Sequence, residues 1–150
     1  MREAISEGYK TALKAGDKRR TATLRAISAA IKDKDIDARG QGKGPLGDEE
    51  LLAMLQKMVK QREESLGIFE KAGREDLAVV EREEIAILNE FLPQGLSEAE
   101  VEAAIAGAIA STGAAGAKDM GRVVAALKGQ YPGRIDFGKA SGKIRAALGA

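Results

Sequence analysis

Clustered cations are the side chains of this sequence most able to bind a ligand. Residues 113–150 contain seven Lys and Arg residues against two Asp residues, a net charge of +5. Lys and Arg neutralise phosphates, and a surface of this sign attracts polyanions. The residues predicted to contact phosphate are Lys118, Arg122, Lys128, Arg134, Lys139, Lys143 and Arg145. Arg122, Arg134 and Lys139 are the strongest of them, because none occupies a position expected in the core.

A second basic cluster, Lys18, Arg19 and Arg20, lies in the first turn of a predicted helix. The helix dipole favours acids there, so the cluster either marks a functional surface or is a solvated run of charges. Residues 1–47 carry 11 basic and 6 acidic residues, net +5, whereas residues 48–92 carry 6 and 12, net −6. The two basic ends therefore either dock on the acidic middle or present at least one surface to a polyanion.

The sequence contains few residues of the types that commonly carry out catalysis. The chain contains no Cys and no His, which excludes thiol catalysis and disulfides and removes the commonest general base and metal ligand. Acidic pairs such as Glu63–Glu64 and Glu83–Glu84 are interpreted as solvated helix faces rather than acid–base machinery. We predict no catalytic residue, no metal site and no cofactor. The glycine-rich segment 39–47 lacks the preceding strand and the Gly-Lys-Ser/Thr ending of a phosphate-binding loop.

The composition indicates an all-α protein of one domain or two small ones. Of the 150 residues, 44% are apolar and only 3% aromatic, so the core must be aliphatic. Apolar residues recur at helical spacing, and no convincing strand alternation is present. The N-terminal segment is amphipathic rather than apolar, and no apolar run approaches the 18 or so residues of a membrane span. We therefore expect no signal peptide, no membrane partner and a cytoplasmic protein.

The elements that position these residues are organised around residues 48–93. This stretch predicts an antiparallel hairpin of two long helices, capped at Asp48, turned at Ala72-Gly73 and stopped by Pro93. Arg62 is the one charge that falls on its apolar stripe. Two helices precede the hairpin, at 2–15 and 17–39, with inward positions that include Ile5, Tyr9, Ala12 and Leu13. A linker at 39–47 connects them to it.

The segment after the hairpin begins with a specific helix-start signal. Ser97 and Glu100 form a capping box, and Leu96 and Val101 are spaced as a hydrophobic staple. Three short helices follow, the second starting near Asp119 and the third capped by Asp136. The predicted architecture is thus an N-terminal helical domain, residues 1–94, and a three-helix C-terminal domain, residues 95–150.

Three segments carry a resemblance to a known family. RRTATLRAISAAIKDKDIDARG, KQREESLGIFEKAGREDLAVVEREEIAILNEFLP and KDMGRVVAALKGQYPGRIDFGKAS resemble the GatB/YqeY family in the same order. The chain is closest to the stand-alone YqeY-like branch. The resemblance implies an all-helical fold like the C-terminal helical and tail domains of GatB, a subunit of tRNA-dependent amidotransferases. In that enzyme a separate cradle domain, missing here, carries the catalysis, and the tail engages tRNA.

Three functions follow from these observations. The first is a non-catalytic accessory protein that binds tRNA or another structured RNA, with a protein of the translation machinery as a further partner. Since Tyr131 and Phe137 are the few aromatics near the basic residues, it would read RNA shape and backbone. The second is an amidotransferase-associated subunit with carbon–nitrogen ligase activity, using glutamine as amide donor, only in a complex. The third is a protein–protein adaptor that uses the acidic hairpin.

Overall fold

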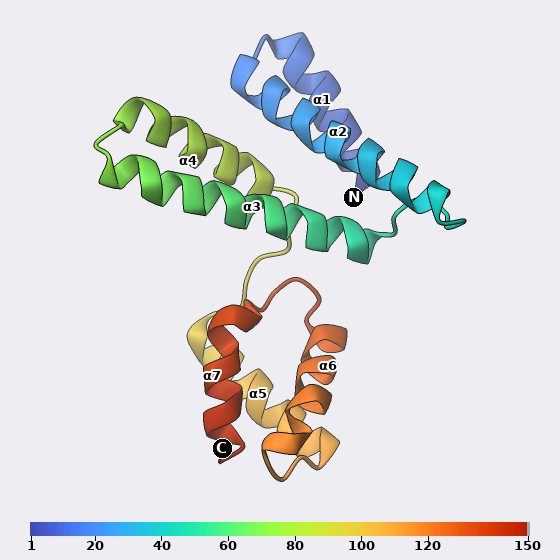
Figure 1. The fold of residues 1–150 in the computed structure, drawn as a ribbon, viewed down its shortest axis with the longest axis vertical. Coiled ribbons are helices and arrows are strands. Elements are labelled where there is room, and N and C mark those ends of the chain that lie inside the picture. The colour runs from blue at the N-terminus through green and yellow to red at the C-terminus, as the bar shows by residue number, and fades with distance from the viewer. Residues whose placement is uncertain (150) are drawn as a thin grey trace. The chain divides into compact units, whose positions relative to one another are not determined.

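The computed structural model describes residues 1–149 and is all-helical over that range, as predicted (Figure 1). It contains seven α-helices, one 3₁₀ helix and no strand there. The chain divides into two compact units, Met1–Leu92 and Pro93–Ala150, which are described separately. None of the helices in the described range is long and apolar enough to cross a membrane.

The first unit is built from two pairs of consecutive helices. They are α1 (Arg2–Ala15), α2 (Lys18–Gly40), α3 (Asp48–Lys71) and α4 (Glu75–Asn89). Helix α1 packs on α2, α3 packs on α4, and α2 also contacts α4 (Figure 1). The core is aliphatic, as the low aromatic content requires; its buried residues are Ile5, Ala12, Leu24, Ile27, Ile31, Leu51, Leu55, Ile87 and Leu88.

Helix α1 buries a narrower stripe than its apolar residues predict. Ile5 and Ala12 are buried as expected, but Leu13 is 55% exposed, so its predicted inward position is wrong. The stripe instead includes Gly8, where an added Cβ would lie 3.4 Å from Phe91 and 3.5 Å from Leu24. At about 100° per residue, Gly8 and Ala12 share a face that Leu13 leaves. Small residues on this face let α1 approach the rest of the core closely.

The helix boundaries of α3 follow local backbone chemistry. The N-cap is Gly47 rather than the predicted Asp48, and the Glu50 carboxylate accepts a hydrogen bond from the Gly47 N–H at 3.0 Å. At the other end, Gly73 adopts φ +69, which lets the chain leave the helix at the expected turn. The Arg74 N–H then donates to the Phe69 carbonyl at 2.9 Å.

The second unit has its own aliphatic core. Its elements are α5 (Glu98–Thr112), the 3₁₀ helix η1 (Ala117–Asp119), α6 (Met120–Gln130) and α7 (Phe137–Ala147). The buried core residues are Ala104, Ile105, Ala108, Val123, Leu127, Ile135, Ala140, Ile144 and Leu148. Ile135 was not expected in the core, because it lies between helices and has no periodic neighbours. Phe137 is partly buried against this cluster.

Helix α5 begins with the reciprocal hydrogen bonds predicted for it. Ser97 Oγ accepts from the Glu100 N–H at 3.1 Å, and Glu100 Oε1 accepts from the Ser97 N–H at 3.3 Å. The side chain and the backbone N–H of Ser97, in that order, lower the pKa of the Glu100 carboxyl. We expect Ser97→Ala to destabilise the second unit by about 1 kcal/mol, because it leaves a helix N–H without its partner. Urea unfolding monitored by circular dichroism measures this, and Ser97→Asp, which restores an acceptor, should recover most of the loss.

Candidate nucleic-acid interface

The seven predicted phosphate contacts in the second unit fall into two groups. The side chains of the first group already interact with other residues of the unit. Arg122 Nη2 donates to Asp119 Oδ1 at 2.8 Å, and its Nη1 donates to the Thr112 carbonyl at 3.1 Å. Asp119 also accepts from the Ala115 N–H at 2.9 Å. These bonds lower the pKa of Asp119, the Ala115 backbone bond first and the Arg122 bond second. Arg122 therefore braces the loop between α5 and α6.

Arg134 and Lys128 have similar roles inside the unit. Arg134 Nε donates to the Gln94 carbonyl at 2.9 Å, and the Arg134 carbonyl accepts from the Leu96 N–H at 2.9 Å. These two bonds tie the start of the unit to the loop before α7. Lys128 Nζ lies 5.5 Å from the centre of the Phe137 ring, a cation–π distance. Each of these three cationic side chains therefore already has an interaction partner within the second unit.

The second group consists of Lys118, Lys139, Lys143 and Arg145. Within residues 1–149 their side chains make no ion pair or hydrogen bond. Lys139 and Lys143 are four residues apart on α7, so they share one flank of that helix, whereas Arg145 lies on another. Lys118 belongs to η1. Lys118, Lys139 and Arg145 are exposed and Lys143 is half-buried, so all four charges are available to an anion.

Two of the three cations predicted in the first unit are neutralised there. Arg19 Nε lies 3.0 Å from Glu83 Oε2, and Arg20 Nη2 lies 2.6 Å from Glu90 Oε2. The bond to Glu90 raises the pKa of Arg20. For these two residues, docking of basic α2 on acidic α4 explains the charge pattern better than a polyanion does. Lys18 is exposed and has no such partner among the described residues.

Gly121, at the start of α6, makes no tight helix–helix contact, because an added Cβ would have nothing within 4 Å. The position costs the helix about 1 kcal/mol relative to Ala. Open space at Gly121 is compatible with close approach of a ligand to the backbone.

The sequence suggested that the acidic pairs of α3 and α4 are all solvated, and this is only partly correct. Glu63, Glu64 and Glu83 are exposed, but Glu84 is half-buried. Burial raises the pKa of the Glu84 carboxyl, opposed by the nearby Arg62 charge. The interpretation of Glu84 as part of a solvated face is therefore wrong.

Arg62 is the reason that carboxylates can be buried between α3 and α4. Its Nη1 lies 2.9 Å from Glu84 Oε2 and 3.7 Å from Oε2 of Glu81, a carboxylate that is only 10% exposed. Both Oε2 atoms are buried and make no hydrogen bond. No group of three or more Asp or Glu residues in the described range could hold a metal ion. The trio is thus a buried charge cluster rather than a metal centre.

A family model described as Yqey-like protein matches residues 2–148. The chain belongs to the YqeY-like family. This match confirms the resemblance carried by residues 19–40, 60–93 and 118–141, and it extends over the helices of both units.

Fungal proteins are among the relatives of this YqeY-like chain. It is 35% identical over 103 residues to "Altered inheritance of mitochondria protein 41, mitochondrial" of Lachancea thermotolerans, covering 67% of this chain and 54% of that protein. The protein of the same name from Eremothecium gossypii is 34% identical over 88 residues, 59% and 46% of the two chains. That from Pyrenophora tritici-repentis is 31% identical over 152 residues, 97% and 80%. The chain thus spans about half the length of the first two.

The names of these relatives correct the predicted location. All three are named as mitochondrial proteins, which contradicts the expectation of a cytoplasmic protein. The cytoplasmic prediction rested on the absence of apolar segments. Such an absence does not distinguish the cytoplasm from the interior of an organelle.

Proposed function

We propose that this YqeY-like chain is a non-catalytic accessory protein that binds structured RNA, with tRNA as the first candidate. The observation that supports the proposal is a set of four cations, in a segment of net charge +5, that have no partner within residues 1–149: Lys118, Lys139, Lys143 and Arg145. Side chains without a carboxylate partner can each neutralise a phosphate without giving up an internal ion pair. The resemblance of this segment to the tRNA-engaging tail of GatB favours the same ligand.

The proposed binding mode uses backbone charge rather than sequence. Phosphate contacts position a protein on a nucleic acid but do not specify bases. The aromatic side chains of this unit, Tyr131 and Phe137, are partly buried against its core, so they offer little stacking surface. We therefore expect the second unit to bind folded RNAs of different sequence with similar affinity.

Salt dependence tests this binding mode. Four contacts at about 0.9 each predict a slope of about −3.6 for log K against log salt concentration. Titration of the protein against bulk tRNA at several salt concentrations measures the slope. A slope near zero, or binding that persists unchanged in 0.5 M salt, contradicts a phosphate-based interface.

We further propose that the two units are separate domains, the first built on the α3–α4 hairpin and the second a three-helix tail. The support is that each has its own hydrophobic core and that the second unit begins with the exposed, non-helical residues Pro93 and Gln94. Limited proteolysis should cut first near residues 93–96 or in the 39–47 loop, because backbone outside helices is most accessible. Early cutting inside residues 52–70, with both loops protected, contradicts this architecture.

A further inference from the structure

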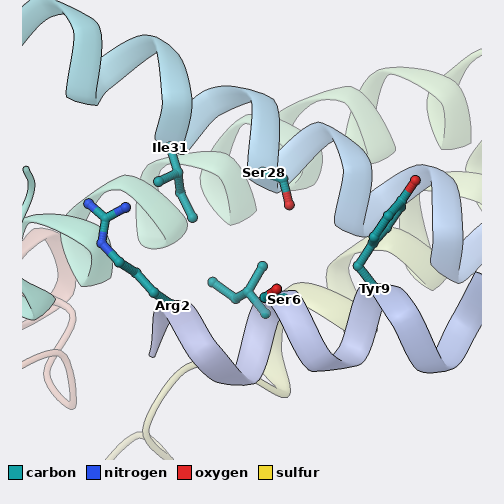
Figure 2. A pocket seen from close by; sticks show the side chains of 6 residues that line it. Arg2, Ser6, Tyr9, Ser28 and Ile31 are labelled. Atoms are coloured by element: carbon teal, nitrogen blue, oxygen red, sulfur yellow. The ribbon is translucent and has the colours of Figure 1, made fainter.

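A groove between α1 and α2 is the feature of the first unit that the proposed function leaves unused. Its volume is about 260 Å³, and Figure 2 shows the side chains around it: Arg2, Ile5, Ser6, Tyr9, Ser28 and Ile31. Ser6 on α1 and Ser28 on α2 are exposed residues with short side chains that line the groove. Buried Ile5 and Ile31 lie beside them and form its apolar part.

The hydroxyl groups along the groove have unused hydrogen-bonding capacity. Ser6 makes no hydrogen bond within the described residues. Ser28 Oγ donates to the Leu24 carbonyl at 2.9 Å, which leaves its lone pairs free. The Tyr9 hydroxyl accepts from Arg25 Nη2 at 3.4 Å, which leaves its own proton free to donate. A ligand in the groove thus meets both donors and acceptors above an apolar floor.

One end of the groove is suited to a planar group. The Tyr9 ring stands between the two helices with a face turned to the groove (Figure 2). The Arg25 guanidinium lies 5.9 Å from the centre of this ring and has no carboxylate partner among residues 1–149. An aromatic face beside an unpaired cation is the combination that binds a base together with its phosphate.

The cation at the opposite end of the groove is already neutralised by an ion pair. Arg2 donates to both carboxylate oxygens of Asp35, at 2.8 and 2.7 Å, and to the Leu46 carbonyl at 3.0 Å. The Arg2 bond lowers the pKa of Asp35 to about 2, so the pair stays ionised and neutral overall. From Arg2 to Tyr9 the helix rises about 10 Å. That length accommodates one base and its ribose. Arg25, which has no carboxylate partner within residues 1–149, lies beside the Tyr9 end.

We propose that this groove binds one unpaired ribonucleotide of the bound RNA, such as a nucleotide of a single-stranded end. The base stacks on Tyr9, the ribose hydroxyls bond Ser6 and Ser28, and the phosphate lies beside Arg25. The inference rests on the proposed RNA binding, and it adds a second contact of a different kind. The second unit would bind backbone charge, whereas the groove would select an unstacked base and a 2′-hydroxyl.

Tyrosine fluorescence tests the groove without any RNA. The chain has no Trp and two Tyr, so Tyr131→Phe leaves Tyr9 as the only strong fluorophore. We expect AMP, GMP, CMP and UMP each to quench it saturably at millimolar concentrations, and the matching deoxynucleotides to bind several-fold more weakly. Ser6→Leu, which fills the groove, should abolish quenching, whereas Thr11→Leu, at an exposed site on the same helix, should not. Ser28→Leu fills the groove from the other helix and serves if Ser6→Leu folds poorly.

A pair of RNAs separates the groove from the rest of the interface. A hairpin RNA with a four-nucleotide single-stranded 3′ end should bind the parent protein about tenfold more tightly than the blunt hairpin, the effect of one stacked base. Ser6→Leu should bind both RNAs equally. If mononucleotides quench Tyr9 but no RNA binds, the proposed function fails and the groove is a free-nucleotide site. If no nucleotide quenches Tyr9 and the single-stranded end adds nothing, the groove proposal is overturned while backbone binding stands.

Discussion

Reversing Lys118, Lys139 and Lys143 to Glu in one protein is expected to weaken RNA binding on the order of 1000-fold. Each change removes a phosphate contact worth about 1.5 kcal/mol, so the three weaken binding on the order of 1000-fold. The salt slope should fall in magnitude by about 2.7, which leaves roughly the single contact of Arg145. Filter binding or fluorescence anisotropy with labelled tRNA measures both quantities. The fold should survive, because none of the three side chains has a partner within the described residues.

A matched control distinguishes the effect of these three positions from the effect of a change in net charge alone. Lys43, Lys57 and Lys60 are exposed and belong to the first unit, so their reversal to Glu changes the net charge equally. This control should bind RNA within a few-fold of the parent. Equal losses in both variants would mean that only net charge matters, and no loss in the first would mean that the second unit is not the RNA surface. Arg122 and Arg134 are left out, because their reversal would break bonds to Asp119 and Gln94.

Local signals predicted the helices well because their causes are local. Asp17 accepts from the Arg20 N–H at 3.0 Å as an N-cap should, and the Ser97–Glu100 box and the Gly73 turn lie where expected. Each of these features involves residues within a few positions of one another. A single sequence is enough to identify such bonds, because the chain geometry already brings the partners together.

The roles of the candidate site residues depended on distant partners and were harder to predict. Arg134 bonds a carbonyl 40 residues away, and Arg19 pairs with a carboxylate 64 residues away. Counting charged residues predicts the sign of the net charge of each segment. It does not show which cations form ion pairs or hydrogen bonds in the folded chain. The groove was missed for the same reason, since Ser6 and Ser28 become neighbours only when α1 and α2 pack.

At Arg62, by contrast, the sequence itself indicated that a distant partner is required. A charge on the apolar stripe of α3 requires an opposite charge on whatever packs against it, since unpaired buried charges are costly. Glu81 and Glu84 supply it from α4. The interruption of the apolar stripe at Arg62 thus predicts an acidic partner, whereas Glu84 was interpreted as part of a solvated face.

Arg62→Met is accordingly expected to destabilise the first unit by about 3 kcal/mol. Removing one partner of a buried charge group costs roughly 3–5 kcal/mol, because the remaining charges lose their compensation. The lower end applies here, since the Arg62 side chain is 36% exposed. Urea unfolding in the Tyr131→Phe background, with Tyr9 fluorescence as the signal, reports on the first unit alone.

Two further variants show whether the loss comes from buried charge. Arg82 also pairs with two glutamates, Glu70 and Glu75, but at exposed positions, so Arg82→Met should cost less than 1 kcal/mol. Replacing Arg62, Glu81 and Glu84 together by Met should restore stability to near the parent value, because a buried charge group is often exchangeable for apolar residues. Equal losses for Arg62→Met and Arg82→Met would contradict the buried-charge explanation.

The loss in Arg62→Met should also depend on pH in a defined direction. Burial raises the pKa of Glu84 above its ordinary value of 4.5, so the folded state holds this proton more tightly than the unfolded state does. Stability linked to this group is therefore present at low pH and is lost as pH rises above 4.5 through the raised pKa. Arg62 opposes this shift, so its removal should cost more at pH 8 than at pH 5. A loss that is the same at both values would mean that Arg62 acts through packing of its aliphatic stem rather than through its charge.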